Sequence, residues 1–510
     1  MKRSAWTYVL AGLMVVAAPL HAASHAHADK KAEAKAATKP IPKEDAAISH
    51  GSVSVHGHAV HYTATAGHLL IRNDDGDATA TVFYVAYTAD GARAGTRPVT
   101  FLYNGGPGSS TIWLHMGSFG PVRVKTLNAK TIPAPPYTLE PNKNTLLDKT
   151  DLVFIDAIGT GFSHAVGKAK NKDFWGVDQD VDAFARFIRR YITVNQRWNS
   201  PKYLIGESYG TTRSAALSLH LQNMGIALNG ITLVSSILNY GIDMPGSDMS
   251  YQLYLPSFAA IAWYHDKLPN KPADLAAFVQ KVCHFADTEY ANALAEGDNL
   301  PAAERDAIAQ KLHQYTGLSV KYLKETDLRI SIGRFRKQLL RDQAITMGRY
   351  DARYEGEDAD SAGERPDYDP SDSAVSPAFI ATFNQYLDHT LHYQHDKPYN
   401  VMASAIRHWD WKHSAPGGHG WKMPMPYVAG DLAQAMRENP SLHVFSANGW
   451  FDLATPFHAT EYDLNHMTLP AKLHSQVHFA YYPSGHMIYL NPKALGELSA
   501  DLDTFYDSTH

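Results

Sequence analysis

The pentapeptide GESYG, residues 206–210, lies between a short apolar run and a stretch with helical periodicity. Residues 202–205 (KYLI) have the composition of a buried strand, and residues 212–222 carry small and apolar side chains at helical spacing before Gly225. A serine in a tight strand-to-helix turn exposes its hydroxyl above the N-terminus of the following helix. The sequence therefore predicts a strand, a sharp turn and a helix, with Ser208 as a nucleophile.

The pentapeptide alone is a weak signal, because it fixes three positions in a chain with 35 glycines. An ordinary surface turn is the alternative, and partners for the serine decide between the two. A serine hydroxyl needs a base to take its proton and a carboxylate to orient that base.

Two downstream segments supply such partners, and each follows a run typical of a buried strand. Residues 443–447 (HVFSA) precede Asp452, and residues 476–482 (QVHFAYY) precede His486. Open α/β sheets assemble their sites beyond the carboxyl ends of the strands, so we expect both side chains at that edge. Two other carboxylates, in segments expected to be helical and solvent-facing, are alternatives to the first: Asp463 and Asp501.

A second glycine-rich segment, NGGPGSS at residues 104–110, follows a strand-like run at residues 99–103. Attack by a serine creates an oxyanion, and backbone N–H groups aimed at it are worth about 3 to 4 kcal/mol each. The N–H of Tyr209 is the expected first donor, and Gly106, whose neighbours allow a close approach, is the expected second. An ordinary glycine turn is the alternative.

These motifs, taken together and in this order, resemble the serine carboxypeptidase family. They are NGGPGSS, DLVFIDAIGTGFSH at residues 151–164, GESYG, the Asp452 loop and GHM at residues 485–487. The resemblance covers about residues 97–237 and 427–506. It implies an α/β-hydrolase fold with a mixed, mostly parallel central sheet and an inserted, mainly helical cap.

The resemblance also implies roles for individual residues. The triad is Ser208, Asp452 and His486, with Gly106 and Tyr209 as the oxyanion hole. Three further residues are expected to bind the C-terminal carboxylate of a peptide: Asn104, Gly105 and Glu207.

The position of Glu207 beside the nucleophile gives this last role a physical reason. A poorly solvated carboxylic acid has a raised pKa, and in its protonated form it donates a hydrogen bond to a substrate carboxylate. Peptide release is then expected to favour acidic pH. A structural acid hydrogen-bonded to backbone is the alternative.

The chain departs from the plant and fungal members of that family. Those members carry a cysteine in the glycine motif and several disulfides, whereas this chain has one cysteine, Cys283. They also have a tryptophan at the position of Leu102 and an acidic residue in the segment that here reads LHMGSFGP, residues 114–121, where His115 is a candidate substitute. Substrate preference and pH optimum therefore do not follow from the resemblance.

Length and composition favour a single large enzyme. The chain has 510 residues, 45% of them hydrophobic, and a net charge of −5, so a nucleic-acid partner is not expected. Residues 1–23 have the pattern of a signal peptide, with no cysteine following for lipid attachment and an apolar run too short to span a membrane. Export to a bacterial periplasm or to the cell exterior, without a stable membrane anchor, is the expected location.

The domain organisation follows from spacing and composition. Residues 24–48 read as a disordered linker, residues 49–239 and 419–510 as two parts of the hydrolase core, and residues 240–418 as the helical cap. Within the first part, residues 52–66 and 78–91 are strand-like and predict an antiparallel edge.

Within the cap, residues 275–297 and 377–393 have helical periodicity, and the acidic stretch 351–372 is expected to be a solvated loop rather than a calcium site. Four aromatic residues are candidates to line the mouth of the site: Trp263, Tyr264, Trp409 and Trp411.

The sequence thus predicts a serine carboxypeptidase that releases C-terminal amino acids through an acyl-enzyme and requires no metal or organic cofactor. Its expected partner is a peptide with a free C-terminus. An esterase or acyltransferase on the same scaffold, and a non-catalytic peptide-binding relative, are the alternatives.

Overall fold

The computed structural model describes residues 39–509. The expected signal peptide and residues 24–38 of the expected linker lie outside this part of the chain. The first strand, β1 (Ala46–Val55), begins within the segment expected to be linker and pairs with β2 (His58–Arg72). The strand-like stretch at residues 52–66 is therefore not one strand, because the chain turns at His56 and Gly57, both with positive φ.

A ten-stranded mixed sheet forms the centre of the described residues. Its three N-terminal strands are antiparallel to their neighbours, and the six that follow are all parallel to one another, so the predicted sheet type is confirmed. Spatially the order is β1, β2, β3 (Ala78–Ala89), β7 (Asp151–Ile155), β4 (Val99–Tyr103), β9 (Lys202–Ser208), β10 (Gly230–Ser236), β13 (His443–Gly449) and β14 (Val477–Tyr482), with β8 (His164–Ala165) paired to β3.

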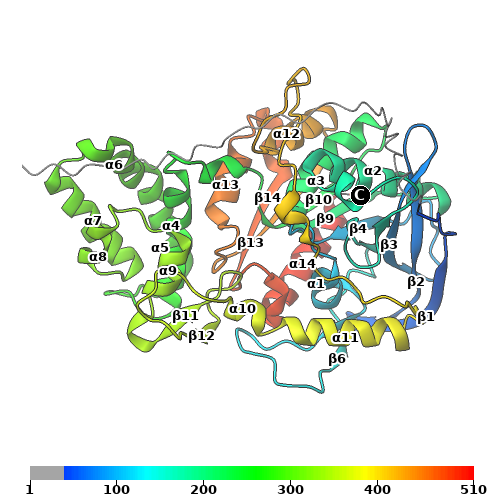
Figure 1. The fold of residues 1–510 in the computed structure, drawn as a ribbon, viewed down its shortest axis with the longest axis horizontal. Coiled ribbons are helices and arrows are strands. Elements are labelled where there is room, and N and C mark those ends of the chain that lie inside the picture. The colour runs from blue at the N-terminus through cyan, green and yellow to red at the C-terminus, as the bar shows by residue number, and fades with distance from the viewer. Residues whose placement is uncertain (1–38, 510) are drawn as a thin grey trace, which may run out of the picture. The chain divides into compact units, whose positions relative to one another are not determined.

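Both faces of the parallel strands are buried, which explains why these strands read as continuous apolar runs. On β9, Leu204 packs in one hydrophobic cluster while its neighbours Tyr203 and Ile205 pack in the other. The first cluster is covered by α2 (Val177–Val194), α3 (Tyr209–Asn223) and α12 (Ala429–Glu438), and the second by α1 (Ile112–Leu114), α11 (Ser376–His389) and α14 (Pro492–Ser508) (Figure 1).

A group of helices from the insertion has a hydrophobic core of its own, in which Phe258 stacks on Phe335 at 4.2 Å between ring centroids. This core extends to Phe451 and Leu453, on either side of Asp452. The helices are α4 (Met249–Tyr264), α5 (Leu275–Phe285), α6 (Ala291–Glu296), α7 (Ala302–Thr316), α8 (Val320–Glu325) and α9 (Ile332–Gln338) (Figure 1).

The two helical segments predicted within the insertion are confirmed, although α11 packs on the core of the sheet rather than on this group. The boundaries of the cap at residues 240 and 418 stay a prediction.

The other short elements are α10 (Pro370–Ser373), α13 (Phe457–Asn465), the pair β5 (Val122–Val124) and β6 (Leu139–Pro141), and the pair β11 (Ile345–Met347) and β12 (Glu355–Glu357). None of the helices in residues 39–509 has the length and hydropathy needed to cross a bilayer.

A fully buried ion pair ties α2 to α3 beneath the sheet edge. The guanidinium of Arg213 donates to Asp180 at 2.7 and 3.3 Å and to the backbone carbonyl of Asn104 at 2.9 Å. Because Asn104 begins the glycine-rich segment, this pair also fixes the position of that loop. Removal of one partner leaves an uncompensated charge in the interior.

We expect Asp180→Asn to lower the free energy of unfolding by about 3 to 5 kcal/mol, measured by urea denaturation, because Arg213 loses its counter-charge. The matched control is Glu497→Gln, which removes one carboxylate from an exposed pair with Lys493 on α14 and should change stability by less than about 1 kcal/mol. Similar losses for the two variants would contradict this assignment.

Candidate active site

Ser208 stands at the junction of β9 and α3 with φ 61° and ψ −130°, a backbone conformation that residues other than glycine rarely adopt. Such a conformation costs about 1 to 3 kcal/mol and persists only where the surroundings enforce it. Here the chain crosses itself closely, since a side chain on Gly206 would collide with the carbonyl of Gly210. The predicted strand, sharp turn and helix are present.

The loops after β13 and β14 bring Asp452 and His486 together. Nδ1 of the imidazole lies 2.8 Å from Oδ2 of the carboxylate, and both side chains are buried. The other carboxylate oxygen accepts from the backbone N–H groups of Ala454 at 2.7 Å and Thr455 at 3.0 Å. The carboxylate is thus fixed by its own loop. With Nδ1 protonated and donating to Asp452, Nε2 of the imidazole is left with a free lone pair.

Thr455 is a positioning residue that the sequence reasoning missed. Its hydroxyl lies 2.8 Å from Oδ2 of Asp452, 3.1 Å from Nδ1 of His486 and 2.9 Å from the backbone carbonyl of Ser235 on β10. The Thr455 hydroxyl has one proton, so it can donate either to the carboxylate of Asp452 or to the backbone carbonyl of Ser235. The only sequence signal for this residue is its place three positions after Asp452.

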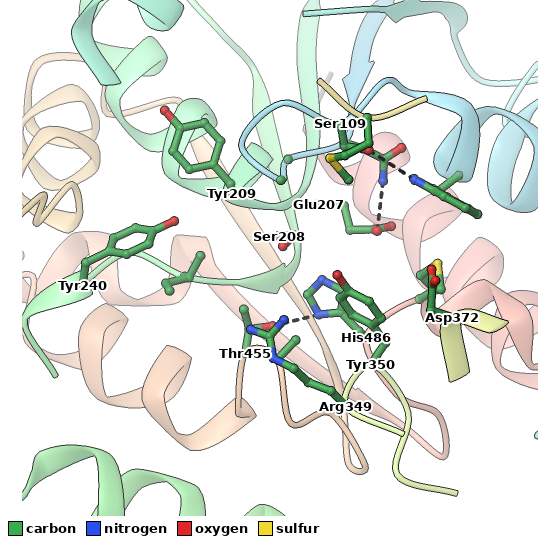
Figure 2. A pocket seen from close by; sticks show the side chains of 18 of the residues that line it. Ser109, Glu207, Ser208, Tyr209, Tyr240, Arg349, Tyr350, Asp372, Thr455 and His486 are labelled. Carbon is green, nitrogen blue, oxygen red and sulfur yellow. Dashed lines mark hydrogen bonds between the residues drawn. The ribbon is translucent and has the colours of Figure 1, made fainter. Parts of the chain in front are cut away.

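The imidazole of His486 points toward Ser208 from across a cavity of about 250 Å³ (Figure 2). Among the described residues no hydrogen bond joins the two side chains, and such bonds often tighten only when substrate is bound. Burial alone would lower the pKa of His486, but the charge and hydrogen bond of Asp452 outweigh burial and raise that pKa. The pair is therefore suited to take up and hold a proton.

The glycine-rich segment lies directly against the turn that carries Ser208. A side chain on Gly105 would collide with the backbone nitrogen of Tyr209. Gly106, at φ 105°, lines the same cavity as Ser208 and Tyr209, and its N–H donates to no other described residue. The two residues predicted to donate to the oxyanion thus line the same cavity.

Asn104 and Glu207 form a hydrogen-bonded pair in the wall of this cavity. The side-chain amide of Asn104 donates to Oε1 of Glu207 at 2.9 Å, and its side-chain oxygen Oδ1 accepts from the N–H of Leu114 at 3.0 Å. Oε2 of Glu207 and the hydroxyl of Tyr489 each lack a hydrogen bond of normal geometry among the described residues, although the two side chains lie close enough to interact. Burial raises the pKa of Glu207 to about 7, against the opposing charge of His486. Below a pH of about 7 Glu207 is therefore mostly protonated, and its carboxyl group can donate a hydrogen bond into the cavity that it lines.

Several sequence expectations for this region are wrong. His115 is buried in the core, 2.7 Å from the hydroxyl of Tyr87, where burial lowers its pKa to about 3, and it does not line the cavity. Of the four candidate aromatic residues only Trp411 lines the cavity, while Trp409 is buried against the ring of Tyr209. The alternative carboxylates do not line it either: Asp463 contacts Asn239, and Asp501 accepts from Tyr482.

The beginning of the acidic stretch is not a solvated loop. Asp351 and Arg353 form a buried ion pair, and the backbone beside them holds both loops of the site. The carbonyl of Arg349 accepts from Leu453 at 3.1 Å, and that of Tyr350 accepts from the N–H of His486 at 2.6 Å. The acidic composition of residues 351–372 does not reveal this packing, because it depends on contacts with distant segments.

Residues 349–372 also contribute three side chains to the cavity that the sequence analysis did not predict, namely those of Arg349, Tyr350 and Asp372 (Figure 2). The guanidinium of Arg349 makes no hydrogen bond or ion pair with any residue in 39–509. It is the only arginine or lysine among the described residues that line the cavity.

We expect the stability of the wild type, relative to Glu207→Gln, to fall as the pH rises. The folded-state pKa of about 7 exceeds the ordinary value of 4.5, so between these values the folded protein keeps a proton that the unfolded chain has lost. The stability linked to protonated Glu207 is thus complete below pH 4.5 and is lost toward pH 7. Urea denaturation of both proteins should show the difference shrink by on the order of 2 to 3 kcal/mol across this range. A constant difference would mean that folding does not raise the pKa of Glu207.

Comparison with known proteins agrees with this geometry. The family model described as serine carboxypeptidase matches residues 55–480. Among solved structures, the chain is similar to Kex1Δp, a prohormone-processing carboxypeptidase from Saccharomyces cerevisiae, with 16% identity and a TM-score of 0.53 over 88% of this chain and 91% of that chain. It is also similar to the proline iminopeptidase of Mycobacterium smegmatis, with 14% identity and a TM-score of 0.37 over 87% of this chain and 98% of that one.

The likeness to the yeast enzyme confirms the α/β-hydrolase fold predicted from the motifs. The family match spans the glycine-rich segment, the Ser208 turn and the Asp452 loop, and it covers well over half of the sequence. The chain therefore belongs to the serine carboxypeptidase family and is a serine-type peptidase.

Proposed function

We propose that this enzyme removes the C-terminal amino acid of peptides through an acyl-enzyme formed on Ser208. The observation that carries the proposal is that Ser208, His486 and the buried Asn104–Glu207 pair line one cavity, with Asp452 bonded to His486 from behind. The sequence pattern at residues 1–23 adds the proposal that the enzyme acts after export, in a periplasm or outside the cell.

In the first half-reaction the Ser208 hydroxyl oxygen attacks the carbonyl carbon of the last peptide bond, and Nε2 of His486 takes the hydroxyl proton. Asp452 stabilises the imidazolium that forms. The N–H groups of Gly106 and Tyr209 hold the oxyanion. When the C–N bond breaks, His486 gives its proton to the departing amine. A water molecule then attacks the ester, and the same proton transfers release the shortened peptide and regenerate the serine.

The substrate carboxylate has a binding partner beside Ser208. A protonated Glu207 donates a hydrogen bond from Oε2, the oxygen that Asn104 does not contact, and the amide of Asn104 has one N–H not used by Glu207. Gly105 completes this group as a backbone neighbour in the same wall. Because ionised Glu207 would repel a carboxylate, binding should weaken as the pH rises through about 7.

The central test compares a blocked dipeptide with its C-terminal amide. Loss of a charged hydrogen bond costs about 1.5 to 3 kcal/mol, so kcat/KM for the amide should be at least about 10-fold lower at acidic pH. Glu207→Gln supplies a neutral donor at every pH, so it should keep this gap and remove its pH dependence. Ser208→Ala is the control for background hydrolysis. Equal rates for acid and amide would favour an esterase or acyltransferase, and a Ser208 that a fluorophosphonate fails to label would favour a non-catalytic binding protein.

Arg349 gives the cavity a preference for acidic substrates, which the family match does not predict. Its unpaired guanidinium is expected to attract acidic side chains of the substrate. We expect Arg349→Gln to lower kcat/KM about 3- to 10-fold for a dipeptide with a glutamate side chain, because an exposed charge pair is worth about 1 kcal/mol, with little change for an alanine analogue.

The matched control is Asp372→Asn, which removes the opposite charge from the same cavity and should raise the rate for the acidic substrate. If Arg349→Gln instead removes the discrimination between acid and amide, Arg349 rather than Glu207 holds the terminal carboxylate.

A further inference from the structure

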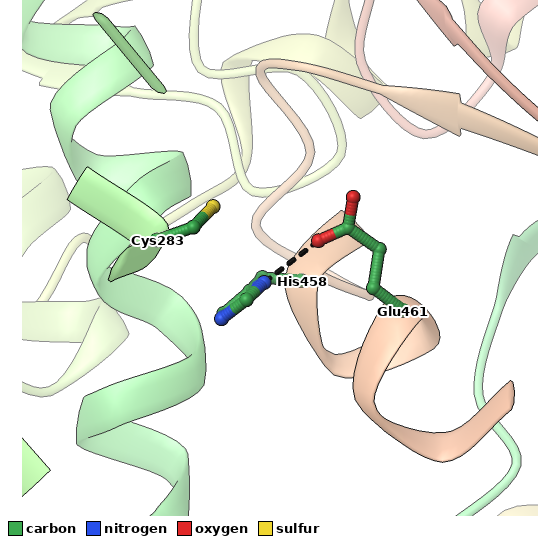
Figure 3. A group of neighbouring side chains, drawn as sticks. All are labelled: Cys283, His458 and Glu461. Carbon is green, nitrogen blue, oxygen red and sulfur yellow. Dashed lines mark hydrogen bonds and ion pairs between the residues drawn. The ribbon is translucent and has the colours of Figure 1, made fainter. Parts of the chain in front are cut away.

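A cluster of metal-ligating side chains lies outside the cavity, where α5 meets α13 (Figure 3). Cys283 is near the end of α5, and His458 and Glu461 are three positions apart on one face of α13. One ligand atom from each lies within 4.8 Å of the other two. His458 is buried, and Cys283 and Glu461 are partly buried.

Neighbouring groups already orient these side chains. Nε2 of His458 lies 2.9 Å from Oδ1 of Asp287, which also accepts from the amide of Gln252 at 3.0 Å. The hydroxyl of Tyr481 donates to Oε1 of Glu461. In metal sites, a ligating histidine commonly donates its second N–H to a carboxylate, and a ligating carboxylate is held by a further hydrogen bond.

The contact between Nδ1 of His458 and Oε2 of Glu461 requires a positive charge. If Nε2 of His458 carries the proton donated to Asp287, Nδ1 presents a lone pair to Oε2 of Glu461 at 2.7 Å. Two lone pairs do not approach so closely without a positive charge between them, which is either a second proton on the ring or a metal ion. A second proton makes an imidazolium that contacts Asp287, Glu461 and Cys283, and a metal ion would replace that proton with Cys283 as a further ligand.

We propose that Cys283, His458 and Glu461 bind one Zn²⁺ ion, with a water molecule as fourth ligand. Sulfur, imidazole nitrogen and carboxylate oxygen are the ligands that zinc takes in tetrahedral sites. Bond lengths of about 2.0 to 2.3 Å place tetrahedral ligand atoms about 3.3 to 3.8 Å apart. Nδ1 of His458 and Oε2 of Glu461, now 2.7 Å apart, would therefore separate by at least about 0.6 Å to admit the ion, while Cys283 already lies within 4.8 Å of both. Binding displaces the thiol proton of Cys283 and the proton between His458 and Glu461.

The proposed ion would join the insertion to the loop of the site. α13 begins directly after the loop that holds Asp452 and Thr455, whereas α5 belongs to the helical group of the insertion. None of the three ligands lines the cavity. The ion therefore has a structural role, and the peptidase chemistry does not pass through it.

The test uses the full chain, stripped with a chelator and dialysed against buffer with or without zinc chloride. We expect one zinc per chain by elemental analysis and a midpoint of thermal unfolding raised by a few degrees. Replacement of zinc by Co²⁺ should give a thiolate-to-metal charge-transfer band. Cys283→Ser, a near-isosteric change at a partly buried position, should lose that band and most of the thermal shift.

The matched control is His265→Gln, which removes another histidine of the insertion, hydrogen-bonded to the carbonyl of Ala352 and not part of the Cys283 cluster. This variant should keep the zinc and the cobalt band. The proposal is overturned if the stripped wild type takes up no zinc, or if Cys283→Ser binds zinc and shows the thermal shift to the same extent as the wild type.

Discussion

The backbone reversal at Ser208 is the constraint on which the site depends. A residue with a side chain is held at φ 61° because β9 must pass into α3 while Gly206 and Gly210 cross at a distance that excludes any side chain. The conformational cost is borne by the buried contacts of the strand and helix on either side. The same crossing brings the glycine-rich segment against Tyr209 and so sets the space in which an oxyanion would form.

The parallel strands extend this constraint to the other side chains. Because β9, β10, β13 and β14 run in one direction, the turns after them open at the same edge of the sheet, and Asp452 meets His486 there. The insertion is part of this arrangement, since the backbone of Arg349 and Tyr350 bonds to both loops. A change in the insertion can therefore alter the site without touching a residue that contacts substrate.

The sequence predicted the parts of the site that depend on local patterns. The strand and turn around Ser208, and the strands before Asp452 and His486, follow from apolar runs bounded by glycine and turn residues. Contacts between distant segments left no such signal. In the sequence, Thr455 does not differ from other threonines in loops. Asp351 is predicted to be solvated because the stretch around it is acidic and does not indicate its pairing with Arg353. His115 was misjudged for the same reason, as its burial against Tyr87 is set by tertiary packing.

The most direct test of this account is a crystal structure of the enzyme after reaction with a fluorophosphonate. We predict phosphorus bonded to Oγ of Ser208, with one phosphoryl oxygen within hydrogen-bond distance of the N–H groups of Gly106 and Tyr209 and with Nε2 of His486 adjacent to the adduct. An adduct on another residue, or a Ser208 adduct whose phosphoryl oxygen points away from both N–H groups, would contradict the account.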